Sequence, residues 1–217
     1  MAANRSKAMP RTLRLAAIAG LGLAVLWFFP LFRIVPIKPA AAESAAFDAQ
    51  TVAAEVWKNQ IPAAVDGAAD LRDVSRAIRQ NLAAATNRFG RSVGVGVAYY
   101  FVRGSGRIVA KERNYLRVAV DGADQEVVSI RIGPVFGNAI RDGCGLFDVN
   151  DFSGLEQFNE LSAALNAHVD TDVTSTLRTE AEEGAVIRFA GCATAPESLA
   201  ERGEPILIII PVEAEML

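Results

Sequence analysis

The sequence YLRVAVDGADQEVVSIRI, residues 115–132, gives the strongest indication of the fold. Apolar side chains alternate with other types from Tyr115 to Val120 and again toward Ile132, which is the period of half-buried strands. Asp121-Gly122, between the two runs, is the dipeptide most typical of a two-residue hairpin turn. The stretch therefore predicts two antiparallel strands joined by a tight turn.

The residues upstream of this hairpin have the same period. The run VGVGVAYYFV, residues 93–102, alternates in the manner of a strand. Gly104-Ser105-Gly106 predicts a second hairpin turn, which leads into a strand over residues 107–113. Together with the central hairpin, these segments predict a meander of four antiparallel strands.

A helix and further strands follow downstream. Apolar residues from Leu155 to Leu165 have helical spacing, and two β-type runs follow at residues 186–190 and 206–212. Four strands, a helix and two more strands are typical of a small OB-like barrel. For residues 91–217 we therefore expect an α+β domain, an OB-like and partly open antiparallel β-barrel with an inserted helix.

Residues 44–90 have helical periodicity instead. Apolar residues from Phe47 to Ile61 share one face, and a second stripe runs from Leu71 to Ala85. Asp66 or Asp70 is placed to cap the second helix. We expect a small helical domain over residues 44–90. A row of arginines on another face suits either an anionic partner or simple solvation: Arg72, Arg76 and Arg79.

The N-terminal part has the pattern of a membrane anchor. A basic segment, residues 1–14, precedes eighteen uncharged residues, LAAIAGLGLAVLWFFPLF (15–32). This length just spans a hydrocarbon core of about 30 Å, and the preceding positive charge keeps the N-terminus in the cytoplasm. We expect a single-pass anchor in the bacterial inner membrane, a linker over residues 33–43 and a periplasmic main domain. The alternatives are a signal peptide cleaved near the alanines 40–42 and a buried helix.

Composition and charge exclude several classes of protein. The chain is 51% hydrophobic and 22% charged, which excludes collagen-like, low-complexity and disordered sequences. Residues 1–38 hold six basic residues and no acid, so the remainder carries 16 basic and 25 acidic residues, a net charge of −9. We expect no nucleic-acid partner, because binding phosphates requires a cationic face.

No motif carries recognisable catalytic or metal chemistry. The oxygen-rich segment 148–151 is followed by Ser153 and Asn159 at the positions where an EF-hand needs Gly and Glu. The chain has no Gly-x-Ser-x-Gly elbow, and its one histidine, His168, excludes sites that need two imidazoles. We therefore expect no enzymatic activity, no metal and no cofactor.

Two cysteines, Cys144 and Cys192, are the chain's only thiols. In an exported domain they meet an oxidising compartment, and each is adjacent to glycine. We expect a disulfide between them, and the alternative is two separate buried thiols. Neither lies near the apolar segment, so a lipid cannot be attached through an N-terminal cysteine.

A series of short motifs in a fixed order resembles the DUF2291 family of predicted bacterial periplasmic lipoproteins. The resemblance covers about residues 44–213. Its motifs are Val56-Trp57, Ile61-Pro62, Gly104-x-Gly106, Ile130-Arg-Ile-Gly-Pro134, Arg141-Asp142, Phe147-x-x-x-Asp151-Phe152, Ala163-Ala-Leu-Asn166 and the terminal Ile-x-Pro211-Val212.

This resemblance implies a small helical domain joined to an OB-like domain, as the residues themselves predict. It also implies a role beside sugar-type ABC uptake systems, with transporter components or a small carbohydrate as partners and no established activity. Two segments depart from the family pattern. Phe136-Gly137-Asn138 replaces an Arg-Gly-Thr-type segment, and Gly154-Leu155 replaces Asn-Gln. A ligand that depends on those polar groups is bound differently here, or not at all.

The long connection over residues 131–152 is the expected functional surface, with Arg131, Arg141, Asp142 and Asp151 as binding residues. Long ordered connections on a rigid scaffold often carry function, and this one also holds family motifs. The structural alternative is that Arg141 and Asp142 pair within the fold. We expect a membrane-anchored periplasmic binding or accessory protein; a protein-binding envelope scaffold and an enzyme of unrecognised type are the alternatives.

Overall fold

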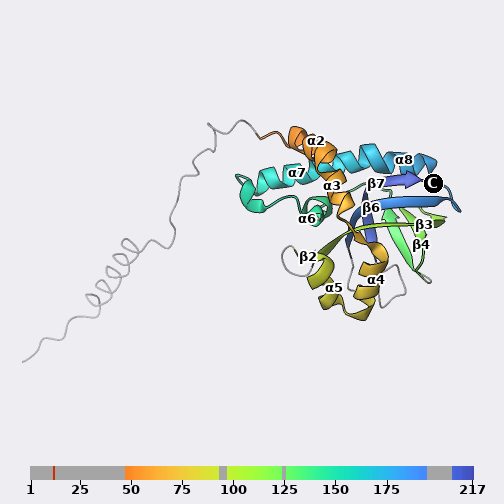
Figure 1. Cartoon of the computed structure of the whole chain (residues 1–217). Helices are drawn as coiled ribbons and strands as arrows, with labels where there is room; N and C mark the ends of the chain where they lie inside the picture. Colours follow the sequence, from red (N-terminus) through yellow and green to blue (C-terminus); the bar gives the residue numbers. More distant parts are fainter. Residues whose placement is uncertain (1–11, 13–46, 93–96, 124–125, 195–206) are drawn as a thin grey trace, which may run out of the picture. The chain divides into compact units, whose positions relative to one another are not determined.

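The computed structural model describes residue 12 and residues 47–92, 97–123, 126–194 and 207–217 (Figure 1). Residues 46–217 form one compact unit. The boundary expected between a helical domain, residues 44–90, and a barrel domain, residues 91–217, therefore lies inside this unit. The two parts share a core, since Leu71 and Val74 belong to the same hydrophobic cluster as the barrel strands.

The expected anchor and linker, residues 15–43, lie outside the described residues. Within the part of the chain that the structure describes, no helix is both long enough and apolar enough to cross a membrane.

Five strands form a closed barrel. They are β3 (Ala98–Lys111), β4 (Tyr115–Val120), β5 (Val127–Arg131), β6 (Val186–Thr194) and β7 (Ile208–Met216). Their order is β3-β4-β5-β7-β6, and β6 pairs with β3 to complete the circle. All pairs are antiparallel except the parallel pair of β5 and β7. The barrel is thus OB-like as expected, but closed where a partly open one was predicted.

The first strand of the barrel is long because it serves two neighbours. Residues 99–107 of β3 pair with β6, and residues 106–111 pair with β4. The hairpin predicted at Gly104-Ser105-Gly106 is wrong, because β3 runs straight through these residues. A Cβ at Gly106 would overlap the carbonyl oxygen of Ala119 on β4, so glycine is required there for close strand approach. Two short strands, β1 (Ala69–Asp70) and β2 (Gly90–Ser92), also pair with β3.

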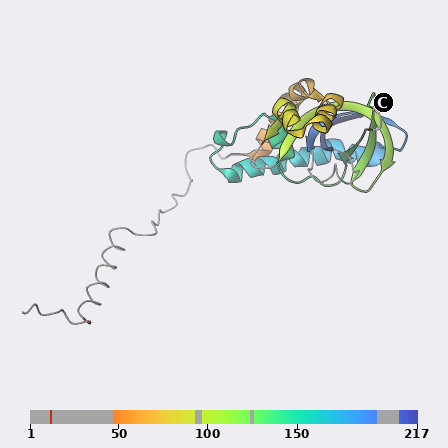
Figure 2. The ribbon, with the colours of Figure 1, turned by 90° about the horizontal axis from the view of Figure 1, so that it is seen from below.

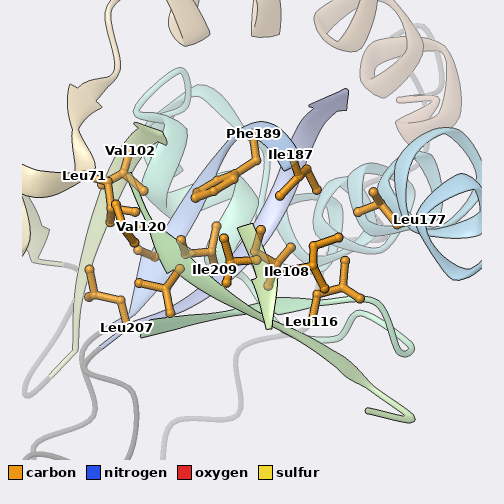
Figure 3. Close-up of a cluster of buried hydrophobic side chains, with 14 of the residues drawn as sticks. Leu71, Val102, Ile108, Leu116, Val120, Leu177, Ile187, Phe189, Leu207 and Ile209 are labelled. Atoms are coloured by element: carbon orange, nitrogen blue, oxygen red, sulfur yellow. The ribbon is translucent and has the colours of Figure 1, made fainter. Parts of the chain in front are cut away.

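The barrel interior is filled by alternate side chains of all five strands (Figure 3). Helices contribute side chains at both ends of this row. Figure 3 shows Leu71 beside Val102 and Val120 at one end, and Leu177 near Ile187 at the other. Both leucines are at most 2% exposed. The helices before and after the barrel strands therefore complete the same core.

The helices are mostly short. They are α2 (Ala49–Asn59), α3 (Ile61–Asp66), α4 (Leu71–Gln80), α5 (Leu82–Phe89), α6 (Ala139–Cys144), α7 (Leu155–His168) and α8 (Ser175–Glu180), with a 3-10 turn, η1 (Val149–Asp151). The single apolar stripe expected from Leu71 to Ala85 covers two helices. Asn81 separates them in an extended conformation, and its side chain caps α5. Asp70 caps α4, as predicted.

One long helical segment packs against the barrel. α7 continues through a π-helical stretch, η2 (Val169–Thr174), into α8. Figures 1 and 2 show this segment on a different side of the barrel from α4 and α5, with α2 lying along α7. A second hydrophobic cluster joins α2, α6 and α7 to the outer faces of β6 and β7. The connection between β5 and β6 is thereby held rigidly.

Candidate functional site

The end of β5 and the residues that follow it are held in place by the side chains of Arg131 and Arg178 and by the backbone of Asn114. Arg131 donates to the Tyr115 hydroxyl at 2.8 Å and lies over the Tyr115 ring. Arg178 on α8 donates to the carbonyl oxygen of Ile132 at 2.8 Å. The backbone N–H groups of Ile132 and Gly133 both donate to the Asn114 carbonyl oxygen. The backbone of Ile132 and Gly133 is therefore fixed at the point where the segment 135–138 begins.

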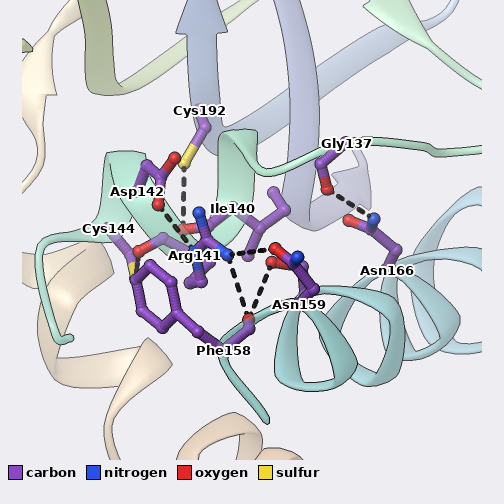
Figure 4. A network of polar contacts seen from close by, with 10 residues as sticks. Gly137, Ile140, Arg141, Asp142, Cys144, Phe158, Asn159, Asn166 and Cys192 are labelled. Atoms are coloured by element: carbon purple, nitrogen blue, oxygen red, sulfur yellow. Dashed lines mark hydrogen bonds and ion pairs between the residues drawn. The ribbon is translucent and has the colours of Figure 1, made fainter. Parts of the chain in front are cut away.

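Arg141 and Asp142 lie inside the fold. Their side chains are 4% and 5% exposed, and Arg141 Nε lies 2.7 Å from Asp142 Oδ1. Arg141 Nη1 donates to the Phe158 carbonyl oxygen at 3.0 Å and to Asn159 Oδ1 at 3.3 Å (Figure 4). The guanidinium carbon is 3.5 Å from the centroid of the Phe158 ring. The pair therefore joins α6 to α7, as the structural alternative predicted.

A polar stripe on α7 faces the segment 135–138. Asn159, Ser162 and Asn166 line a groove of about 410 Å³ together with Asp170 of η2. Asn166 Nδ2 donates to the Gly137 carbonyl oxygen at 2.9 Å, which holds the opposite wall in place (Figure 4). Small residues between the polar ones, Ala163 and Ala167, leave the groove open.

The groove presents neutral hydrogen-bonding groups. The Asn159 oxygen is occupied by Arg141 and the Asn166 nitrogen by Gly137, so the Asn159 amide nitrogen and the Asn166 amide oxygen are left for a ligand. Asn138 adds a third amide on the opposite wall. Phe136 lies at the groove with 80% of its surface exposed. The Asn159 nitrogen is a free donor and the Asn166 oxygen a free acceptor, and both lie near the exposed ring of Phe136. These groups suit a ligand that has both hydroxyl groups and an apolar face.

The four predicted binding residues do not form one site. Arg141 and Asp142 are adjacent and buried, and Arg141 acts behind the groove by orienting Asn159. Arg131 braces the end of β5 against Tyr115. Asp151 is exposed in η1, where its backbone N–H donates to the Asp148 carbonyl oxygen.

The arginine row on α4 is paired rather than free. Arg72 pairs with Asp70, Arg76 with Asp73 and Arg79 with Glu126. Glu126 is 5% exposed, so its 2.7 Å contact with Arg79 joins α4 to the residues that precede β5. Each positive charge has a carboxylate partner, which favours the structural interpretation of this face.

Comparisons with known proteins agree with this architecture. The crystal structure of an OB-fold protein from Thermotoga maritima has 25% sequence identity and a TM-score of 0.67, covering 79% of this chain and 99% of that one. A comparison with curated proteins gives no match. The model of the DUF2291 family, described as predicted periplasmic lipoproteins, matches residues 22–215. The chain belongs to the DUF2291 family. The family description makes it a periplasmic, membrane-associated protein.

In this DUF2291 protein both cysteines are free, buried thiols, so the expected disulfide is corrected to the alternative of two separate thiols. The sulfur atoms are directed at different carbonyl groups of α6. Cys144 Sγ lies 3.5 Å from the Arg141 oxygen and Cys192 Sγ lies 3.9 Å from the Ile140 oxygen (Figure 4). Burial raises the pKa of both thiols. Among the described residues, no group of three or more His, Cys, Asp or Glu side chains is placed to hold a metal ion.

The sequence predictions missed the groove residues of the DUF2291 protein, although a signal for them exists. Asn159, Ser162, Asn166 and Asp170 follow one another at intervals of three or four residues, which places polar groups on one face of a helix. The apolar residues of α7 define its buried face, and the polar stripe lies beside that face along the groove. Within the functional surface expected over residues 131–152, Phe136 is exposed, whereas Val135, Arg141 and Asp142 are buried.

Proposed function

We propose that this protein is a membrane-tethered periplasmic binding protein whose ligand is a small neutral molecule rich in hydroxyl groups, of the carbohydrate class. The observation that carries the proposal is the groove between residues 135–138 and α7. It combines amide groups whose orientation is fixed by internal hydrogen bonds with the exposed ring of Phe136.

The charge of the groove supports a neutral ligand. Asp170 is the one charged residue among the described residues that line it. Asp170 lies 3.8 Å from Arg178 Nη1 and accepts a hydrogen bond from Thr174, so its charge already has partners within the fold. The lining therefore offers neither an anion nor a cation an unpartnered opposite charge. Hydroxyl groups donate and accept, so they can satisfy the Asn159 nitrogen and the Asn166 oxygen at once.

Binding rather than catalysis is proposed for the same reason. General acid–base chemistry by carboxylates uses two groups with different pKa values, whereas the described residues of the groove include one. We also propose that the protein acts beside a sugar-type ABC uptake system, which would take up the bound ligand.

The ligand proposal is tested by isothermal titration calorimetry on the full chain in a polyoxyethylene detergent, which carries no sugar headgroup. Neutral mono- and disaccharides are titrated one by one. We expect at least one to bind, and Asn159→Ala and Phe136→Ala each to weaken its binding at least tenfold. Asn87→Ala, an exposed asparagine on α5, is the matched control and retains full affinity. Absence of heat with every saccharide, or unchanged affinity in Asn159→Ala, contradicts the proposal.

The tether that we propose is the apolar segment 15–32, retained as a single-pass helix with the N-terminus in the cytoplasm. Its support is the uncharged length and the basic residues before it. Alkaline phosphatase fused after Leu217 should be active, and the protein should stay in the membrane after carbonate extraction. If the intact mass of the purified protein matches a chain that begins near residue 43, the segment has been cleaved and the retained anchor is contradicted.

A further inference from the structure

A second cavity, of about 710 Å³, lies apart from the groove. Its walls come from the junction of α2 and α3, the end of α5 with β2, the strand β3 and the C-terminal end of α6. This volume falls in the range of about 300–1,000 Å³ that is usual for small-molecule sites. None of the groove residues on α7 lines it.

The cavity is cationic. Arg88 and Arg91 line it, and no Asp or Glu is among the described residues that do so. Arg72, Arg76, Arg79, Arg141, Arg178 and Arg188 all lie within 4 Å of a carboxylate oxygen. Arg103, Arg107, Arg117 and Arg131 form no ion pair but donate hydrogen bonds to other oxygen atoms. Among the described residues, Arg88 and Arg91 have neither an ion-pair partner nor a hydrogen-bond acceptor for their side chains. The two arginines therefore give this cavity a positive charge, although residues 39–217 together carry a net charge of −9.

Each guanidinium group lies against a neighbouring group of the fold. The guanidinium carbon of Arg88 is 4.7 Å from the centroid of the Phe89 ring. Arg91 lies against Gly145, which ends α6 with a φ of 73°. A Cβ at residue 145 would overlap the Arg91 guanidinium, so a glycine at this turn makes room for the charged group. A guanidinium group can donate two parallel hydrogen bonds to two oxygens of a carboxylate or phosphate.

The other walls of the cavity are suited to the body of an organic molecule. Phe89, Phe101 and Leu146 provide apolar surface, while Asn59 and Gln60 provide amide groups. We propose that this cavity binds a small, water-soluble organic anion, in which a carboxylate or phosphate contacts Arg88 and Arg91 and an apolar portion contacts the two phenylalanines. The site is independent of the saccharide groove.

The test is isothermal titration calorimetry on the full chain in the same detergent, with phenyl phosphate, benzoate and phenol as probes. We expect phenyl phosphate or benzoate to bind with one site per chain, and phenol not to bind. Raising the salt concentration from 50 to 500 mM should weaken binding, because part of the attraction is between charges that salt screens. Arg88→Gln and Arg91→Gln should each weaken binding at least tenfold.

Matched controls separate this site from a general effect of charge. Arg113→Gln removes one exposed positive charge elsewhere and should retain full affinity. Both cavity arginines are exposed, so the variants should keep the melting temperature of the parent protein. Unchanged affinity in the double variant Arg88→Gln/Arg91→Gln, or no binding of either anion, overturns the proposal. Binding of soluble dioctanoyl phosphatidylglycerol without binding of phenyl phosphate or benzoate would assign the site to a lipid headgroup and also overturn it. Failure of saccharide binding at the groove would leave these results unaffected.

Discussion

Arg141 and Asp142, neighbours in the chain, form an ion pair 2.7 Å long in which both side chains are at least 95% buried. The same arginine donates to the Phe158 carbonyl oxygen and to Asn159 of α7. Removing one partner of a buried ion pair leaves an uncompensated charge inside the protein, which strongly destabilises the fold. The pair therefore couples the packing of α6 to the shape of the groove.

Replacing Arg141 with Ala should lower the free energy of unfolding by about 3 kcal/mol, the scale for removing one partner of a buried ion pair. Urea denaturation followed by circular dichroism measures this change. Arg113→Ala, at an exposed position, should change stability by less than about 0.5 kcal/mol. A comparable loss of stability in both variants would contradict the structural role of Arg141.

Asp70 links the stability of α4 to pH. Its carboxylate accepts hydrogen bonds from the backbone N–H and from Nε of Arg72, each at 2.9 Å. The hydrogen bond from the Arg72 side chain lowers the pKa of Asp70 below its ordinary value. The ionised form therefore stabilises the fold above that ordinary value, and this stabilisation is lost as the pH falls through the lower pKa of the folded state.

Asp70→Ala should lower stability at pH 7 by about 1 kcal/mol, the usual effect of losing an N-cap. Asp70→Asn keeps a capping oxygen but cannot titrate, so its stability should fall less than that of the parent protein between pH 5 and pH 2. Urea denaturation at a series of pH values checks both expectations. If the stability of the parent and Asp70→Asn proteins depends equally on pH, ionisation of Asp70 does not stabilise the fold.

Gly106 tests whether β3 is one continuous strand. A Cβ at this position would overlap the Ala119 carbonyl oxygen, so Gly106→Ala should lower stability by about 1–3 kcal/mol, the range for overpacking. A Cβ at Gly67 would make only ordinary contacts and the backbone there has a negative φ, so Gly67→Ala is the matched control, expected to change little. If both variants unfold at the same urea concentration as the parent protein, the close approach of β3 and β4 is contradicted.

The thiols should be inert in the native protein. Burial raises the pKa of Cys144 and raises that of Cys192 further, so few thiolates exist at pH 8. Iodoacetamide should modify neither cysteine under native conditions, and both after unfolding in guanidinium chloride without a reducing agent. Mass spectrometry of protein recovered from the cell envelope reads out the result. A pair of peptides joined through Cys144 and Cys192 would show that the disulfide forms and would contradict the two free thiols.

Local periodicity was enough to predict much of the fold. The strands near Tyr115–Val120 and 125–132, the helix from Leu155 and the last two strands all have a repeat that follows from which face is buried. The order of these elements predicted an OB-like barrel, which the structure and the Thermotoga maritima protein confirm. A family resemblance was also detectable, because its motifs lie at fixed places along the chain.

How these elements meet depends on contacts between segments that are distant in the sequence. Gly104-Ser105-Gly106 has the composition of a turn, yet it lies inside a strand, because the requirement for glycine comes from β4, a different segment. The charges of Arg141 and Asp142 suggested a surface, yet both are buried by α7, which lies beyond them in the chain. Arg88 and Arg91 meet Gly145 for the same kind of reason. A sequence pattern reports the environment of a residue along its own helix or strand, whereas burial, barrel closure and cavities arise from contacts between segments far apart in the chain.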